Sequence, residues 1–291
     1  MINAATPQGF CSVRIWGVSL QEIAQASNLN KKNIQIFGGM QKGLPLANPA
    51  QSGLLFSGTI LQAFGNWIGT DQTLDFVVMA GTGSASQPGG VGTIAAPKNI
   101  VLNWSAGQQL SAALAPCLKT AFPNYKQKIN ISPKIVRPNT EVTFYPTLEQ
   151  LAQYCLETSH NIIQDPTYPG VALYLQNDTL VATDGSAALG TPATQIAFQD
   201  MIGQPTWISA PNITTKLVMR ADLAVRGQIK LPPSLVTNSA AAATSLVNQN
   251  VSFAGGFQIV SLRHVGRYRA PQADAWVTVV EAAPNQVQGT T

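Results

Sequence analysis

Alternating apolar and polar positions predict short strands through the first hundred residues. Residues 33–37 and 54–64 are rich in strand-forming side chains, and residues 74–78 place apolar side chains at every second position. This two-residue period is typical of a strand with one buried face. A stretch of Gly, Ser, Thr and Pro at residues 81–92 has little to pack and predicts a loop or linker.

The apolar period lengthens to that of helices after residue 100. The first helix is expected to take Ser105 as its N-cap. It contains Pro116, which removes a backbone donor and predicts a kink or a break into two short helices. Its apolar positions are Leu110, Leu114, Cys117, Leu118 and Ala121.

A second helix is predicted at residues 147–157. Thr147 and Gln150 have the spacing of a capping box. The apolar stripe of this helix consists of Leu148, Leu151, Ala152, Cys155 and Leu156. A hairpin should follow, because residues 171–175 and 180–183 flank Asn177-Asp178, which tolerate left-handed turn geometry.

Strands return in the last third of the chain. Thr215 and Leu217 should lie on one face of a strand, with Lys216 and Arg220 on the other. Further strands are predicted at residues 228–231, 257–262 and 275–281, and the neutral stretch at residues 232–262 is expected to include a long loop.

This order predicts a mainly β fold with an inserted α+β module. We expect two similar antiparallel β-barrel modules, at residues 1–100 and 196–283, separated by the insert at residues 101–195. Residues 284–291 should form a flexible tail.

Composition changes the expected kind of function. Of the 291 residues 45% are hydrophobic, which is ordinary, but only 10% are charged, against about 25% in a typical soluble domain. This scarcity suggests a surface covered by neighbours in an assembly. The net charge of +4 is small for a nucleic-acid-binding protein.

Three well-separated cysteines, Cys11, Cys117 and Cys155, argue against a disulfide framework and for a reducing compartment. The N-terminus lacks the features of a signal peptide, and polar residues interrupt the neutral stretch at residues 43–70 too often for a membrane span. We therefore expect a soluble protein made in the cytoplasm, without membrane insertion.

The sequence offers no convincing catalytic constellation. Cys155 and His160 have the spacing of a partial metal site, but no second pair completes it and Cys155 belongs to an apolar stripe. Asp71 and Asp75 are interpreted as solvated strand residues, and Gly81–Gly83 as linker. We predict no catalytic residue, no cofactor-binding residue and no metal site.

The densest charge cluster comprises Arg263, His264, Arg267 and Arg269, with Tyr268 between them. It could contact nucleic acid, form a polar hairpin end, or form ion pairs with a neighbouring subunit. Four positions are too few to hold a duplex by phosphate contacts. We therefore assign Arg263, Arg267 and Arg269 to an interface with an adjacent subunit or another protein.

The order of these features resembles the baseplate hub, or tail hub, proteins of contractile-tailed bacteriophages. Four stretches carry the resemblance, and together they span most of residues 30–282. They are residues 54–60 (LLFSGTI), 143–152 (TFYPTLEQLA), 202–206 (IGQPT), and the pair 263–266 (RHVG) with 276–278 (WVT). Arg267 departs from the family, in which many members have an acidic residue at that place, so no ionic contact is transferred there.

The resemblance implies a homotrimeric structural protein of the virion. Each subunit would carry two tail-tube-like β-barrels, so that three subunits form a pseudo-sixfold ring joining a sixfold tail tube to a threefold central spike. Its partners would be the tube protein, the spike and other baseplate proteins, with the genome passing through the lumen. The alternatives are another all-β virion component, such as a tail-tube or distal-tail subunit, or a virion-associated cell-wall hydrolase.

Overall fold

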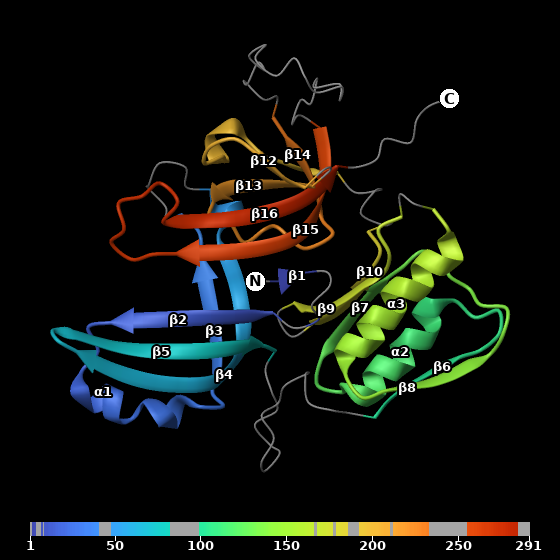
Figure 1. Ribbon diagram of the computed structural model, residues 1–291, viewed down its shortest axis with the longest axis horizontal. Coiled ribbons are helices and arrows are strands. Elements are labelled where there is room, and N and C mark those ends of the chain that lie inside the picture. Colours follow the sequence, from blue (N-terminus) through green and yellow to red (C-terminus); the bar gives the residue numbers. More distant parts are fainter. Residues whose placement is uncertain are drawn as a thin grey trace. The chain divides into compact units, whose positions relative to one another are not determined.

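The computed structural model contains a mainly β fold with helices in its middle third, which confirms the predicted fold class (Figure 1). It divides into two compact units, residues 1–37 with 54–187 and residues 38–53 with 188–291. The structure describes residues 2–3, 7, 9–40, 48–81, 99–165, 168–176, 179–185, 192–209, 212–232 and 255–284. The Asn177-Asp178 turn, the C-terminal tail, and most of the predicted 81–92 linker and 232–262 loop lie outside the described residues.

A four-stranded sheet forms the first part of unit 1. Its order is β2 (Phe10–Trp16), β5 (Asp71–Ala80), β4 (Gly53–Ile68) and β3 (Asn33–Gly38), so the three strands predicted from alternation are confirmed. A two-residue strand, β1 (Ile2–Asn3), precedes them. The short helix α1 (Leu20–Ala24) begins with a capping box between Ser19 and Glu22, and the 3-10 helix Ala26–Leu29 follows it.

The second part of unit 1 contains the two long helices and two small sheets. Strands β6 (Ile100–Trp104) and β8 (Glu141–Tyr145) pair antiparallel. Strand β10 (Thr179–Thr183) pairs antiparallel with β9 (Ala172–Gln176), as the hairpin pattern predicts, and parallel with β7 (Lys126–Asn130). The parallel pair was not predicted, because the two strands are about fifty residues apart in the chain.

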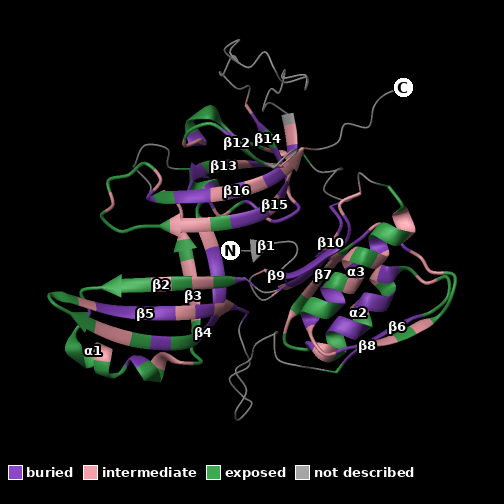
Figure 2. Cartoon of the chain, viewed as in Figure 1, coloured by how far each residue is buried: buried purple, intermediate pink, exposed green. Residues whose placement is uncertain are grey.

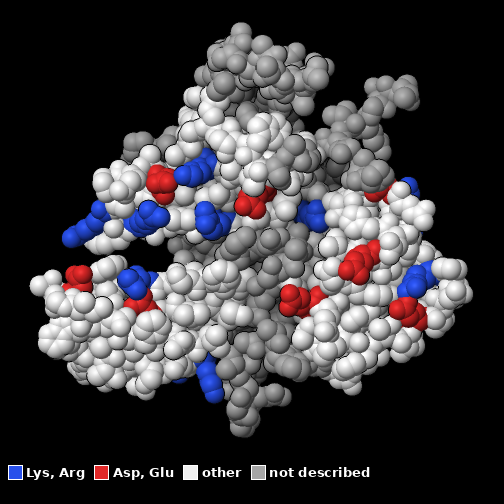
Figure 3. Space-filling model, in the orientation of Figure 1, with Lys and Arg blue, Asp and Glu red and all other residues white. Residues whose placement is uncertain are grey.

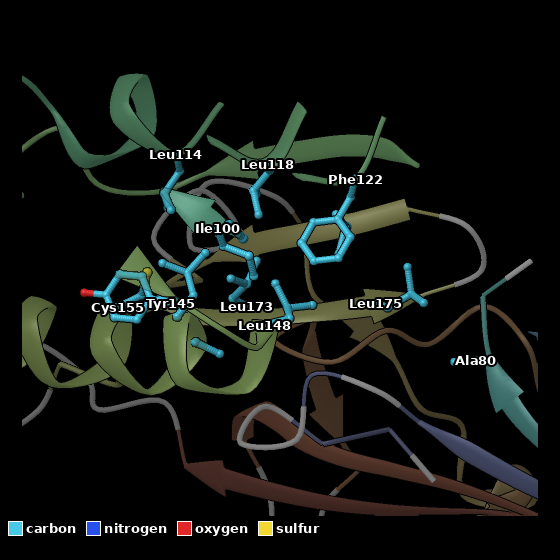
Figure 4. Packing of buried hydrophobic residues seen from close by; sticks show 14 of the residues in the cluster. Ala80, Ile100, Leu114, Leu118, Phe122, Tyr145, Leu148, Cys155, Leu173 and Leu175 are labelled. Atoms are coloured by element: carbon cyan, nitrogen blue, oxygen red, sulfur yellow. The ribbon is translucent and has the colours of Figure 1, made fainter. Parts of the chain in front are cut away.

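The second predicted helix is confirmed and is longer than expected. Helix α3 (Leu148–Ile163) extends the predicted segment to Ile163, and the Thr147 hydroxyl accepts a hydrogen bond from the Gln150 backbone N–H. Leu151 and Cys155 of the stripe are fully buried. Figure 2 shows the buried side of this helix, and Figure 4 shows its residues within the hydrophobic core.

The first predicted helix is correct in its apolar face but wrong at its start. Helix α2 (Leu110–Ala121) begins after Gln109, because the chain turns at residues 105–108, where the Gln108 N–H donates to the Ser105 carbonyl. Ser105 is therefore not the N-cap. The predicted break at Pro116 does not occur, since α2 remains one helix with Leu114 and Leu118 fully buried on the same face.

Unit 2 contains the second large sheet. Its strand order is β11-β14-β15-β16-β13-β12. The bounds are β11 (Thr194–Gln195), β12 (Thr206–Ser209), β13 (Asn212–Val218), β14 (Gln228–Leu231), β15 (Gly255–Gly266) and β16 (Trp276–Pro284). Two 3-10 helices, Pro49–Gln51 and Phe198–Asp200, also belong to this unit.

The two sheets contain the same four-strand arrangement. The order β2-β5-β4-β3 in unit 1 corresponds to β13-β16-β15-β14 in unit 2, with the strands taken in the same order along the chain. The long hairpin strand has a register shift at matching places, between Ile60 and Gln62 in β4 and between Ile259 and Ser261 in β15. A bulge is a local feature of strand geometry, so its recurrence aligns the repeats residue by residue. The module boundaries expected at residues 100 and 195 stay a prediction.

Candidate partner interface

The three arginines assigned to an interface lie on the hairpin formed by β15 and β16. Arg263 is on β15, directly opposite Val279 of β16, and Val279 in turn lies opposite Lys216 of β13. These three residues form one row on the outer face of the sheet, where Arg263 and Lys216 are exposed. The neighbouring row, Thr215, Val280 and Leu262, is buried, because successive residues of a strand point to opposite faces.

The connection between β15 and β16 carries the other two arginines. Residues 267–275 are closed at their base by a hydrogen bond from the Arg267 N–H to the Ala275 carbonyl, at 2.7 Å. Arg269 has a left-handed backbone (φ 54°), and its guanidinium lies 5.0 Å from the ring centroid of Tyr268. Arg267, Tyr268 and Arg269 are all exposed, so the fold brings the predicted interface arginines to one end of one hairpin.

The electrostatics of the hairpin are basic. Residues 212–218 and 255–284 contain four Lys or Arg and two Asp or Glu. One of the acids, Asp274, is bound to Lys216 at 3.0 Å between Nζ and Oδ2. That hydrogen bond and the charges of Lys216 and Arg267 lower the pKa of Asp274. Lys and Arg side chains gather along this hairpin in Figure 3, and the surface is therefore suited to an acidic partner.

His264 does not belong to the basic surface. Its Nδ1 lies 2.9 Å from the Thr278 hydroxyl oxygen, which itself donates to the Arg220 carbonyl and accepts from the Arg220 N–H. The Thr278 hydroxyl thus links the His264 ring to the Arg220 backbone. Burial lowers the pKa of His264 to about 4. The imidazole is thus neutral at physiological pH and has a structural place in the sheet.

Arg220 is buried, so the prediction that it shares a strand face with Lys216, which is exposed, is wrong. It lies just beyond the end of β13, and its guanidinium donates to Asp222 through Nε at 2.7 Å and Nη2 at 2.6 Å. Nη1 lies 3.4 Å from Asp200, which also accepts from the Gln51 amide at 3.0 Å. Buried charges are stable only when paired in this way. The closeness of Arg220 and Asp222 in sequence could have indicated that these two residues pair. Asp200 and Gln51 could not be predicted as part of the network, because they are remote in sequence.

Asp75 is also buried, so its interpretation as a solvated strand residue is wrong. Arg14, directly opposite on β2, donates to Asp75 through Nε at 2.5 Å. Asn66 and Thr73 donate to its other oxygen at 2.9 and 3.2 Å. Burial alone would raise the pKa of Asp75, but the hydrogen bonds from Arg14 and Asn66 and the charge of Arg14 hold it below its usual value. Asp71 is exposed, as expected.

Cys155 and His160 form no joint site. Cys155 is fully buried in the helical core, where burial raises the pKa of its thiol, whereas His160 is exposed and its ring contacts Tyr168. Within the described ranges, no three His, Cys, Asp or Glu side chains are grouped so that they could hold a metal ion. No helix among those residues is long and apolar enough to cross a bilayer.

Comparisons with known proteins give similarity of fold alone. No protein-family model and no curated protein matches the sequence. The fold is similar to that of the tail protein from Neisseria meningitidis MC58, with a TM-score of 0.55 and 8% identity over 98% of this chain and 90% of that chain. It is similar to the 43 kDa tail protein of prophage MuSo2 from Shewanella oneidensis, with a TM-score of 0.50 and 8% identity over 97% and 90%.

These structural neighbours are tail proteins. The likeness covers nearly all of this chain in both cases, and so includes the two sheets and the helical part between them. The basic residues of the β15–β16 hairpin are described from this chain's own structure, since the likeness concerns the fold alone. At 8% identity no residue of the neighbours can be transferred to it.

Proposed function

We propose that this chain is a structural virion protein, the homotrimeric hub of a phage tail baseplate, which joins the sixfold tail tube to the threefold central spike. Two observations support a tail role. The structural neighbours are tail proteins, and only 10% of the residues are charged, as suits a protein whose surface is covered by other subunits. Interface cores are depleted in Lys, Glu and Asp.

The repeated strand arrangement carries the hub proposal. A subunit with two equivalent sheets, β2-β5-β4-β3 and β13-β16-β15-β14, offers six equivalent positions when three subunits form a ring. A closed ring of this kind requires head-to-tail interfaces whose rotation closes. Such a ring can bind a sixfold partner through the features that the two repeats have in common. It can bind a threefold partner through the features in which the two repeats differ.

In this proposal the chain catalyses no reaction and needs no cofactor. Arg263, Arg267 and Arg269 contact an adjacent subunit or tail protein, and their exposure on one hairpin supports that role. The genome passes through the ring without sequence-specific binding and the chain does not insert into a membrane. The protein is made in the cytoplasm of the host bacterium and ends in the tail baseplate.

The main alternative is another virion component, such as a tail-tube or distal-tail subunit. A tube subunit would supply one sheet module per chain to a sixfold ring, and the repeat within this chain favours the hub instead. A cell-wall hydrolase is the weaker alternative, because the buried acids of the described residues are engaged within the fold. Asp75 and Asp200 are each held by an arginine, and Asp184 accepts from the Ser132 N–H and the Tyr168 hydroxyl, so none forms an open pair for acid–base chemistry.

The mass of the purified full chain in solution tests the proposal. Native mass spectrometry and light scattering should give a trimer, about 92 kDa for chains of 30.8 kDa. Adding the tail-tube protein of the same virus should give a complex with two tube subunits per hub chain. A monomer that binds no tail component, or a sixfold ring of the chain by itself, would overturn the hub assignment.

A further inference from the structure

The two repeats differ at the end of the long hairpin. In unit 1 a two-residue turn, Gly69-Thr70, joins β4 to β5, and Trp67 and Ile68 beside it are 63% and 75% exposed. In unit 2 the corresponding connection has nine residues, 267–275. Counting from the shared bulge, Arg267 takes the place of Ile68. One hairpin end is thus short and apolar, and the other is long and basic.

The cross-strand rows of residues next to these hairpin ends also differ, again with an apolar residue in unit 1 where unit 2 has a basic one. Arg14, Asp75 and Phe64 form a row across β2, β5 and β4, and Lys216, Val279 and Arg263 form the corresponding row across β13, β16 and β15. The basic residue at the first position is common to both repeats. At the third position an exposed Phe64 in unit 1 is replaced by the exposed Arg263 in unit 2.

This difference has a consequence for symmetry, which rests on the proposed trimeric hub. In the proposed ring the two repeats of each subunit are related by a rotation about the ring axis. The six hairpin ends would then lie on one side of the ring, alternately apolar and basic. A sixfold partner would have to place one and the same surface against both kinds. A threefold partner can present a separate, matching surface to each.

We propose that the hairpin ends face the threefold partner, and that the basic end, Arg263 with residues 267–275, docks onto an acidic surface of that protein. The sixfold tube then binds the opposite side of the ring. Among the residues that the structure describes, the ion pairs do not include Arg263, Arg267 or Arg269. The acid within the loop, Asp274, is bound by Lys216 and also interacts with the charge of Arg267, but one carboxylate cannot balance Lys216 and three arginines.

Charge reversal at this hairpin tests the proposal in assembled particles. The variant Arg263→Glu with Arg267→Glu is compared with Lys126→Glu with Lys128→Glu, which changes the same charge at exposed positions of β7. Arg269 is left unchanged because its left-handed backbone makes substitution a second variable. Each full chain is supplied in trans to a virus that lacks its own copy, and the tails are imaged by electron cryomicroscopy.

The hairpin variant should yield tails that keep the hub on the tube and lack the distal threefold component, with complete tips reduced about tenfold or more. The control variant should give complete tips. Loss of the tube with the threefold component retained would place the hairpin on the tube side and overturn the proposal. Complete tails that fail to deliver DNA would assign the arginines to nucleic acid, and complete infectious tails would deny them any docking role.

The mass of the purified variants separates this proposal from the proposed function. A wild-type chain that is not a trimer contradicts the hub itself. A trimeric wild type with a monomeric hairpin variant would assign Arg263 and Arg267 to contacts between copies of this chain, and would overturn the docking proposal while leaving the hub in place. The docking proposal requires that both variants remain trimers.

Discussion

Arg14 and Lys216 occupy the same position in the two repeats, and each binds a carboxylate that reaches it from a different part of the fold. Asp75 lies directly across the sheet from Arg14 and its side chain is 11% exposed. Asp274 reaches Lys216 from the loop after β15 and is 41% exposed. Arg14 and Lys216 are both exposed, but the carboxylate of Asp75 is shielded from water and that of Asp274 is not. The two ion pairs at equivalent positions should therefore contribute differently to stability.

Replacing Asp75 with Ala should therefore lower the free energy of unfolding by about 1–3 kcal/mol, because Asn66 and Thr73 lose a charged hydrogen-bond acceptor. The same change at Asp274 should cost less than about 1 kcal/mol. Urea unfolding of both full-length variants measures the difference. Equal losses at the two positions would contradict the role of burial.

The loss of stability caused by Asp75→Ala should depend on pH, because Asp75 can be protonated. Its pKa is lower in the folded chain than its ordinary value of 3.8, so its contribution is present above that value and is lost as the pH falls below it. The difference between wild type and Asp75→Ala should shrink in acid.

Arg220 is predicted to be the most sensitive charged residue of unit 2. Arg220→Met keeps much of the side-chain volume but leaves Asp200 and Asp222 without their cation, and should cost about 3–5 kcal/mol. Lys216→Met, at an exposed pair in the same unit, should cost less than about 1 kcal/mol. Thermal and urea unfolding followed by tryptophan fluorescence would rank the two. A loss at Arg220 no greater than that at Lys216 would mean that its buried network contributes little.

His264 should make the protein less stable in mild acid. The folded chain holds its pKa at about 4 against an ordinary 6.5, so the unfolded chain binds more protons between these values. The free energy of unfolding then falls as the pH decreases from about 6.5 to 4, by on the order of 3 kcal/mol in total. His264→Gln should flatten that part of the curve. An unchanged slope in the variant would show that other groups cause it.

Leu151 tests the packing of α3. Its side chain is fully buried, so Leu151→Ala should lower the free energy of unfolding by about 2–5 kcal/mol. Gln153→Ala, on the exposed side of the same helix, loses only a side-chain hydrogen bond to Glu157 and should cost about 0.5 kcal/mol or less. Circular dichroism during urea unfolding compares them. A loss well below 1 kcal/mol at Leu151 would contradict the burial seen here.

Elements with a strong local period could be predicted from the sequence. The stripe of α3 and the Thr147 cap lie within one short segment, and strands β3, β4 and β5 have local alternation that survives in the fold. The hairpin end that carries Arg263, Arg267 and Arg269 was one of the alternatives for this charge cluster, and it too depends on residues that are neighbours in the chain. Each of these needed only residues close together in sequence.

The wrong predictions concern residues whose partners are distant in sequence. Asp75 looked solvated because its cation, Arg14, is 61 residues away. Arg220 was placed on the strand face of Lys216 because strand alternation was extended past the end of β13. Its partner Asp200, and Gln51 that donates to Asp200, come from two other segments. Burial of a charge depends on partners that a local period cannot reveal, so sequence alone misjudges such residues.

Unit 2 is built from two separate segments of the chain, and this affects its folding during synthesis and the stability of truncated fragments. This unit begins with residues 38–53 and resumes only at residue 188. Gln51 donates to Asp200 and its carbonyl accepts from the Ala221 N–H, so a fragment starting at residue 188 would lack these partners. During synthesis the early segment emerges well before the strands it joins, and contacts of such long sequence separation form slowly. Folding of this chain should therefore finish after translation, with unit 1 complete first.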